Sequence, residues 1–244
     1  MHSRHLMLPG GAMGRNVHLW AHGWWGEPVI AFPSAAGFAH EWQQEGMVEV
    51  LRPWIDAGKI KLYCPESNVS EAWTREGDPS WRIGRHVAYE KFVTNELLAF
   101  IREDCHLPSV HPTVLGCSLG GMYAALMTLK HPMLFPRSLS MSGRYEATNF
   151  TEGFQNSEVY FNNPLAFVPN LSGTALDNAR RGKLTLVCGQ GPFEEGCIEE
   201  TLALAAILHD KGIPYERDIW GKDSRHDWDW WQKQLRVHAY RLFS

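Results

Sequence analysis

The sequence predicts an α/β fold in which a mostly parallel central sheet carries helices on both faces. Short β-rich segments alternate along the chain with longer segments of helical periodicity, which is typical of such a sheet. One β-rich segment, residues 112–117, also leads through a glycine-rich turn directly into a helical pattern. A chain of 244 residues can bury one sizeable core, so we expect a single domain over residues 1–244.

The predicted elements follow one another along nearly the whole chain. Seven runs rich in β-branched and other apolar residues are expected to be strands: residues 17–22, 29–32, 59–64, 112–117, 137–141, 184–188 and 216–220. Five helical patterns lie between or after them: residues 41–57, 86–105, 119–130, 199–211 and 227–242. The polar, glycine-rich residues 1–16 precede the first of these strands, and we expect this terminus to be frayed.

The turn after residues 112–117 has the pattern Gly-x-Ser-x-Gly, with Ser118 between Gly116 and Gly120. Glycines at these two positions let the backbones of strand and helix approach each other, and the serine projects at the start of the helix. An ordinary glycine-rich turn could carry the same residues, but the strand before and the helix after favour a reactive serine. Ser118 is therefore the candidate nucleophile.

A serine hydroxyl needs a general base and an acid that orients the base, and both candidates follow in the chain. Residues 184–188 open into a loop with two adjacent carboxylates, Glu194 and Glu195. His226 is the histidine that follows the last predicted strand, where the chain order Ser, acid, His requires the base. Either glutamate could instead complement the dipole of the next helix, so the choice of acid stays open.

Five motifs carry a resemblance to a known family: FPSAAG at 32–37, GCSLGG at 116–121, YFNNP at 160–164, CGQGPFE at 188–194 and WGKDSRHDWDWW at 220–231. With them the chain resembles the α/β-hydrolases of the putative-esterase family, which contains esterase D, S-formylglutathione hydrolase and the mycolyltransferases. It is most similar to a bacterial esterase-like subgroup, and the resemblance covers most of the chain. The resemblance implies the α/β-hydrolase fold, but fold-level similarity does not fix the substrate.

The resemblance also implies roles for individual residues. Nucleophile, acid and base would be Ser118, Glu194 and His226. An aromatic residue directly before the acid is usual in the subgroup, and Phe193 therefore favours Glu194, whereas a direct comparison with mycolyltransferases favours Glu195. The predicted activity is hydrolysis of a carboxylic ester through a covalent acyl-enzyme. The alternatives are acyl transfer to a sugar or other alcohol, and a non-catalytic binding member of the fold, against which the complete Ser, Glu and His set argues.

An acyl-transfer intermediate needs two backbone N–H groups that hold its oxyanion. The residue after the nucleophile, Leu119, is expected to supply one of them. The small residues that follow the predicted strand 29–32 are expected to supply the other, from Ala35 or, as the alternative, Ala36. A plain loop without this role is the other interpretation of residues 33–37.

Two segments interrupt the alternation and are expected to lie near the site. Residues 142–181 contain many asparagines and aromatic residues without periodicity, which predicts a cap-like insertion with short helices, for example at 164–168. Residues 65–84 are predicted to form a long loop on the same side, and long loops in compact domains are often functional. Substrate-binding candidates on these and neighbouring segments are Phe38, His40, Trp42 and Trp73, although ordinary packing would also explain these aromatic residues.

Composition limits the partners and the compartment. A net charge of −4 without a basic cluster argues against nucleic acid, and no run is long and apolar enough for membrane insertion. The five cysteines contain no C-x-x-C pair and are predicted to be reduced thiols, which favours a cytoplasmic enzyme. Since no residues are spaced as metal ligands, we expect neither a metal nor an organic cofactor. The expected partner is a small ester, and homo-oligomerisation stays open.

Overall fold

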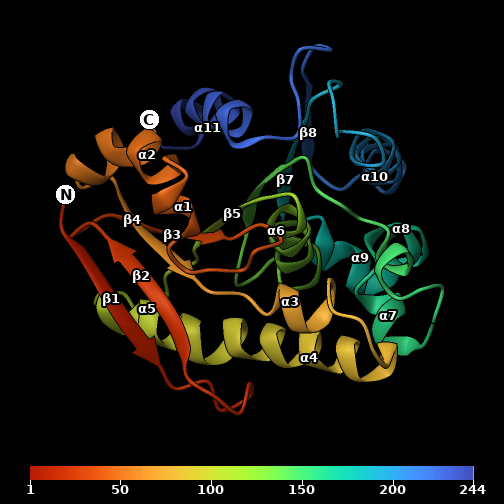
Figure 1. The fold of residues 1–244 in the computed structure, drawn as a ribbon, viewed down its shortest axis with the longest axis horizontal. Helices are drawn as coiled ribbons and strands as arrows, with labels where there is room; N and C mark the ends of the chain where they lie inside the picture. Colours follow the sequence, from red (N-terminus) through yellow and green to blue (C-terminus); the bar gives the residue numbers. More distant parts are fainter. Residues whose placement is uncertain (244) are drawn as a thin grey trace.

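The structure, a computed structural model, describes residues 1–243 and contains one eight-stranded sheet (Figure 1). The strands are β1 Ser3–Leu8, β2 Val17–His22, β3 Glu27–Phe32, β4 Ile60–Pro65, β5 Thr113–Cys117, β6 Arg137–Met141, β7 Lys183–Cys188 and β8 Tyr215–Ile219. Their spatial order is β1-β2-β4-β3-β5-β6-β7-β8. β2 pairs antiparallel with β1 and β4, and all other neighbours are parallel. The predicted mostly parallel sheet is confirmed.

Helices lie on both faces of this sheet. They are α1 Glu41–Gln44, α2 Met47–Asp56, α3 Val69–Ala72, α4 Pro79–Phe92, α5 Leu98–Asp104, α6 Leu119–Lys130, α7 Ser157–Phe161, α8 Pro164–Phe167, α9 Gly173–Ala179, α10 Cys197–Lys211 and α11 Trp228–Phe243. A π-helical segment, Val93–Leu97, joins α4 to α5, and 3₁₀ turns occupy Ala147–Phe150 and Val168–Asn170. Within residues 1–243, no helix is long and apolar enough to cross a membrane.

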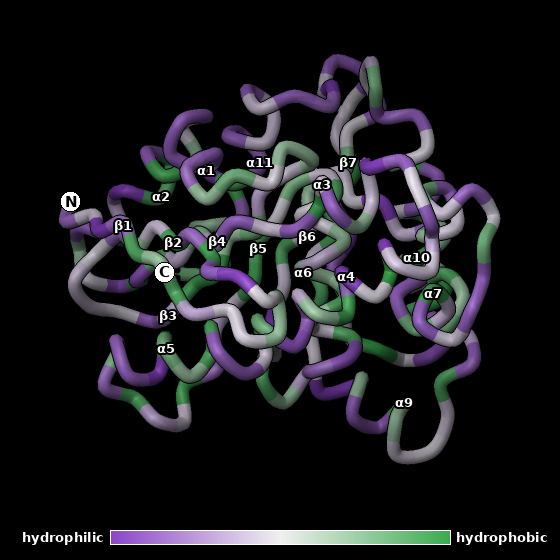
Figure 2. The backbone as a smooth tube through the Cα atoms, turned by 60° about the horizontal axis from the view of Figure 1, so that its bottom comes forward, coloured by the Kyte–Doolittle hydropathy of each residue, from purple (hydrophilic) through white to green (hydrophobic). Residues whose placement is uncertain are grey.

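Each face of the sheet has its own hydrophobic core. On one face, buried side chains of α4, α5, α6 and α10 pack with inward residues of the strands, among them Phe32, Val114 and Leu186. On the other face, α2 and α11 pack over residues such as Leu115 and Leu139. Figure 1 shows α2 and α11 on one side and α4 and α5 on the opposite side, and Figure 2 shows hydrophobic residues along the central strands. Burial on both faces explains the nearly continuous apolar runs of these strands.

The N-terminus differs from the prediction. Residues 1–16 were expected to fray, but Ser3–Leu8 form the edge strand β1 and pair with β2 in register from Ser3 opposite His22 to Leu8 opposite Val17. In this strand alternate residues are buried or half-buried, and the outward ones are Ser3, His5 and Met7. Polar outward residues are allowed on an antiparallel edge, which is why composition alone did not indicate a strand.

The predicted loop 65–84 is only partly a loop, because it contains α3 and the first residues of α4. α4 begins at Pro79, whose fixed φ suits a first helical position, and the Asp78 carboxylate accepts a hydrogen bond of 3.0 Å from the Ser80 N–H. The predicted helix 41–57 is likewise divided into α1 and α2 at Gly46, which has φ 72°. Both differences arise at Gly, Pro or Asp residues that punctuate the helical pattern.

The structure brings the ends of the central strands together. β5, β6 and β7 are parallel neighbours, so residues directly after them lie along one edge of the sheet. Ser118, Ser142 and Gly189 are these three residues. The segment between β6 and β7 contains only short helices, including the predicted one at 164–168, which is observed as α8. Its role as a cap over this edge stays a prediction.

Candidate active site

Ser118 occupies a tight turn between β5 and α6. Its backbone has φ 56° and ψ −123°, a region that non-glycine residues rarely adopt and that is common at functional sites. A Cβ atom on Gly116 would lie 2.0 Å from the Gly120 carbonyl oxygen, and one on Gly120 would lie 2.4 Å from the Pro33 carbonyl oxygen. The Ser118 N–H donates to the Met141 carbonyl at 2.9 Å. These close approaches explain the two glycines and keep the strained serine in place.

His226 lies between Ser118 and Glu194. Its Nε2 is 3.0 Å from the Ser118 Oγ, and its Nδ1 is 3.2 Å from the Glu194 Oε2. Since the carboxylate can only accept at Nδ1, this nitrogen carries the proton and Nε2 is free to accept the Ser118 hydroxyl proton. The backbone N–H of His226 donates to the Pro192 carbonyl at 3.1 Å. The sequence-predicted serine, histidine and one glutamate are thus adjacent although they are far apart in the chain.

The structure distinguishes the two candidate carboxylates. Glu194 is 1% exposed and faces His226, while the neighbouring Glu195 is exposed. The second Glu194 oxygen, Oε1, accepts a hydrogen bond of 2.6 Å from the Ser142 hydroxyl and one of 3.3 Å from the Gly189 N–H. Glu194 is therefore a buried carboxylate fixed by neutral donors, and the geometry favours it over Glu195 as the partner of His226.

Two residues that the sequence analysis did not single out support this arrangement. The Ser142 hydroxyl, which donates to Glu194, accepts a hydrogen bond of 3.0 Å from the Trp231 Nε1–H. The Trp231 ring also meets the His226 ring edge to face, with centroids 4.8 Å apart. Trp231 bonds to a residue 89 positions away, and such a distant partner leaves no local signal in the sequence. Ser142 has φ 49° directly after β6, and the sequence does not reveal such strain.

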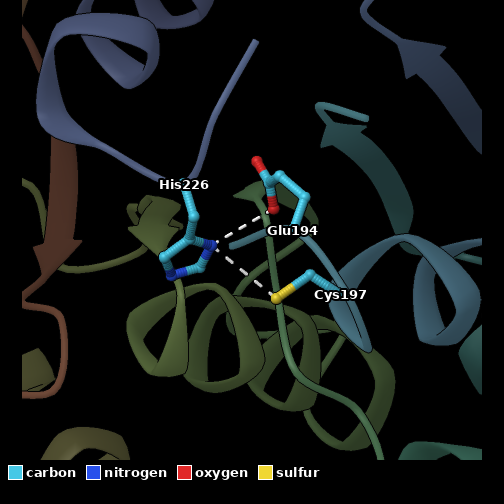
Figure 3. Close-up of side chains that lie close together, drawn as sticks. All are labelled: Glu194, Cys197 and His226. Carbon is cyan, nitrogen blue, oxygen red and sulfur yellow. Dashed lines mark hydrogen bonds and ion pairs between the residues drawn. The ribbon is translucent and has the colours of Figure 1, made fainter. Parts of the chain in front are cut away.

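A thiol also reaches this cluster. Cys197 Sγ lies 3.7 Å from His226 Nδ1, on the same side of the ring as Glu194 (Figure 3). The sequence analysis found no metal-ligand spacing, but Glu194, Cys197 and His226 each place one donor atom within 4.8 Å of the other two. Folding joins the loop after β7, the start of α10 and the loop before α11, which explains why the spacing gave no signal. Burial is the main reason that the pKa of Cys197 is raised to about 12.

The loop proposed to hold an oxyanion lies beside Ser118 and is held by Glu41. The Ser34 N–H donates to the Glu41 carboxylate at 2.7 Å and the Ser34 hydroxyl donates to it at 2.5 Å. Burial raises the pKa of Glu41, although both bonds oppose this effect. Ala35 and Ala36 are exposed, and within the described residues 1–243 their N–H groups and that of Leu119 find no protein acceptor. The choice between Ala35 and Ala36 stays a prediction.

The predicted substrate-binding aromatic residues divide into two groups. Phe38 is 57% exposed and stacks on His40, with ring centroids 5.3 Å apart, in the segment that follows Ala35. Trp42 and Trp73, in contrast, are buried in the two cores and were wrongly predicted to wall a pocket. The indole Nε1–H of Trp42 donates to the Phe32 carbonyl at 2.9 Å, so this side chain supports the end of β3.

A pocket of about 520 Å³ lies in the segment between β6 and β7. It is lined by hydroxyl, amide and carboxylate groups together with two aromatic rings, those of Tyr160 and Phe161. Phe161 is 55% exposed, so an aromatic face is open to solvent there. The sequence analysis placed a cap-like insertion here but gave no substrate-binding role to the residues that line this pocket.

Comparisons with known proteins identify the family and the fold of the chain. A family model described as "Putative esterase" matches residues 60–242, whereas no curated protein matches the sequence. Among solved structures, a ferulic acid esterase is 16% identical, with a TM-score of 0.75 and coverage of 100% of this chain and 99% of that chain. S-formylglutathione hydrolase from Staphylococcus aureus is 15% identical, with a TM-score of 0.72 and coverage of 100% of this chain and 97% of that chain. MPT51 from Mycobacterium tuberculosis is 16% identical, with a TM-score of 0.76 and coverage of 100% of this chain and 98% of that chain. At these identities the structural matches establish the fold.

Proposed function

The chain belongs to the putative-esterase family and is a carboxylic ester hydrolase, and we propose that it cleaves its ester through a covalent acyl-enzyme on Ser118. One observation carries this proposal, namely the unbroken line of hydrogen bonds from Ser118 through His226 to Glu194. A serine activated by a histidine that a carboxylate orients is the arrangement that acyl transfer needs.

In the first half of the reaction, Ser118 Oγ attacks the ester carbonyl carbon while His226 Nε2 accepts the hydroxyl proton. Glu194 then stabilises the imidazolium through Nδ1–H. The N–H groups of Leu119 and Ala35 stabilise the negative oxygen of the tetrahedral intermediate, and neither N–H is engaged with a protein acceptor within residues 1–243. The imidazolium then donates its proton to the leaving alkoxide of the ester. The alcohol leaves, and the acyl group remains on Ser118.

In the second half, a water molecule attacks the acyl carbonyl while His226 Nε2 accepts its proton. Collapse of the second tetrahedral intermediate breaks the bond to Ser118, which regains the proton from His226, and the carboxylic acid leaves. His226 begins and ends neutral, so one water is consumed for each ester cleaved. The exposed Phe38 and His40 pair, next to the proposed oxyanion loop, is suited to contact the part of the substrate nearest the carbonyl.

The test is labelling with a fluorophosphonate, which reacts with activated serines, together with a p-nitrophenyl ester series from acetate to long acyl chains. Wild type should be labelled and active, while Ser118→Ala and His226→Ala should lose labelling and most of kcat. Ser138→Ala is the matched control, because this buried hydroxyl lies in β6 and has no partner within residues 1–243. A folded Ser118→Ala protein with near-wild-type activity would disprove the mechanism.

A further inference from the structure

Two donor atoms of different chemistry, an oxygen and a sulfur, converge on Nδ1 of the His226 ring. Figure 3 shows both the Glu194 carboxylate and the Cys197 thiol directed at Nδ1, the nitrogen that faces away from Ser118. Nδ1 lies 3.2 Å from Glu194 Oε2 and 3.7 Å from Cys197 Sγ. The proposed hydrolysis needs only the carboxylate, so the thiol at this position has no role in it.

The two separations from Nδ1 match two edges of a tetrahedral metal site. Zinc bonds are about 2.0–2.1 Å to nitrogen, about 2.0–2.2 Å to oxygen and about 2.3 Å to sulfur. Tetrahedral angles then place nitrogen and oxygen about 3.4 Å apart and nitrogen and sulfur about 3.6 Å apart. The observed 3.2 Å and 3.7 Å each differ from these values by about 0.2 Å or less. The third edge, between the Glu194 carboxylate and Cys197 Sγ, lies within 4.8 Å, so the three donors are near enough to close around one ion.

We propose that Glu194, Cys197 and His226 form an inhibitory binding site for a thiophilic divalent cation such as Zn²⁺ or Cd²⁺. A set of one nitrogen, one sulfur and one oxygen donor suits borderline and soft ions and disfavours Mg²⁺ and Ca²⁺, which prefer oxygen ligands. Glu194 and Cys197 are 1% and 2% exposed and the His226 side chain is 20% exposed, so the three donors lie in a largely buried place, where a water would complete the coordination as fourth ligand.

Inhibition follows from the tautomer of His226 and rests on the proposed function. The ion takes the place of the Nδ1 proton, and a neutral ring bound through Nδ1 carries its proton on Nε2. Nε2 then donates instead of accepting, so it cannot remove the proton of Ser118. The Nδ1 proton moves to Nε2 through solvent, and the Cys197 thiol releases its proton to solvent. One proton is thus released for each ion bound, and removal of the ion restores the active tautomer.

Binding is tested first by a readout that does not depend on activity. Cd²⁺ added to the wild-type protein should produce the ultraviolet charge-transfer band of a Cd²⁺–thiolate bond, saturating at one ion per chain. Cys197→Ser and Cys197→Ala should weaken binding at least tenfold. Cys105→Ser is the thiol control, since Cys105 contacts Tyr63 in another part of the fold. His5→Asn controls for the exposed pair of His5 and His18, whose ring nitrogens are 2.9 Å apart.

The second readout is the rate of fluorophosphonate labelling with and without Cd²⁺. Labelling of wild type should stop when the band saturates and should return after a chelator is added. In the two Cys197 variants, Cd²⁺ should leave the labelling rate close to the metal-free rate of the same variant. A band or an inhibition constant that is unchanged in folded Cys197→Ser and Cys197→Ala would overturn the site. Failure of metal-free wild type to be labelled would instead count against the proposed mechanism, while the band would still test the site.

Discussion

The two ends of the parallel sheet hold carboxylates in different ways. At the carboxyl ends of the strands, Glu194 is held by neutral donors and faces His226. Near the amino end of β4, Asp104 accepts hydrogen bonds from Arg4 at 2.6 and 2.8 Å and from Tyr63 at 2.8 Å, and Lys61 Nζ is 2.7 Å from Oδ2. One carboxylate is paired with a group that can gain and lose a proton, and the other with permanent cations.

This difference separates a site for chemistry from a site for stability. Arginine and lysine stay charged, so the Asp104 cluster is fixed and ties β1 and β4 to the end of α5. His226 changes charge during acyl transfer, and a carboxylate without a permanent cation can respond to that change. The comparison predicts that a change at Glu194 affects rate and a change at Asp104 affects stability.

The largest expected effect is that of Glu194→Gln on rate. A glutamine amide would favour the wrong tautomer of His226, so kcat for a p-nitrophenyl ester should fall by roughly 10⁴-fold while the melting temperature changes little. Glu195→Gln is the matched control, because this neighbouring carboxylate is exposed, and it should stay within about twofold of wild type. Equal small losses in both variants would remove the carboxylate from the proposed mechanism.

The counterpart is Asp104→Asn, which leaves Lys61 and Arg4 without their shared anion. The Lys61 side chain is only 6% exposed, so its charge loses its compensation in a largely buried place. The free energy of unfolding should fall by roughly 3 kcal/mol, measured by denaturant titration. Activity per folded molecule should be unchanged, since the cluster lies at the opposite end of the sheet. A loss of kcat without a loss of stability in Asp104→Asn would contradict the assignment of this residue to stability.

Regular segments of the fold could be predicted because their pattern is local. Apolar runs and glycine-rich turns indicated β2 to β8 and α6. The Gly-x-Ser-x-Gly turn selected Ser118, and chain order selected His226. β1 could not be predicted, because an edge strand with an exposed face carries no continuous apolar run. The choice between Glu194 and Glu195 depended on which side chain turns inward, which adjacent residues of the same type cannot reveal.

The contacts that support Glu194 and His226 could not be predicted from the sequence for a different reason. Ser142 meets Glu194 across 52 positions and Trp231 across 89 positions, so no periodicity links these residues. The same holds for Cys197 and His226, which are 29 positions apart. Parallel neighbours bring the ends of β5, β6 and β7 to one edge, but the identity of the groups that touch there follows only from the packed loops.

A smaller effect is expected when the support of Glu194 is weakened. Removing the Ser142 hydroxyl takes away the 2.6 Å bond to Oε1 and leaves the Trp231 N–H without its acceptor. Since hydrogen bonds to charged groups are worth about 1.5–3 kcal/mol, kcat should fall roughly tenfold while KM stays constant. Ser142→Gly and Ser142→Ala are compared, because both lack the hydroxyl, while alanine keeps the Cβ atom and its strain at the observed φ of 49° and glycine relieves that strain.

Equal losses of kcat in these two variants would assign the effect to the hydroxyl, which both lack, and a loss in only one of them would contradict that assignment. A rise in KM at constant kcat would contradict the positioning role, because Ser142 acts through Glu194 and does not touch the substrate. Ser140→Ala is a matched control, since Ser140 lies in β6 two positions before Ser142 and its hydroxyl is hydrogen-bonded to the Tyr145 hydroxyl at 2.6 Å.

The smallest effect concerns the free energy of unfolding at acidic pH. Burial disfavours the charge of Asp104, but hydrogen bonds from Arg4, Lys61 and Tyr63 outweigh burial and hold its pKa at about 2, below its ordinary 3.8. A depressed pKa stabilises the folded state above the ordinary value, and this contribution is lost as the pH falls from about 4 towards 2. Unfolding of wild type and Asp104→Asn is therefore compared at pH 6, 4 and 3. The difference in unfolding free energy between wild type and Asp104→Asn should be the same at pH 6 and 4 and smaller at pH 3. A difference that grows on acidification would show that other groups control this end of the sheet.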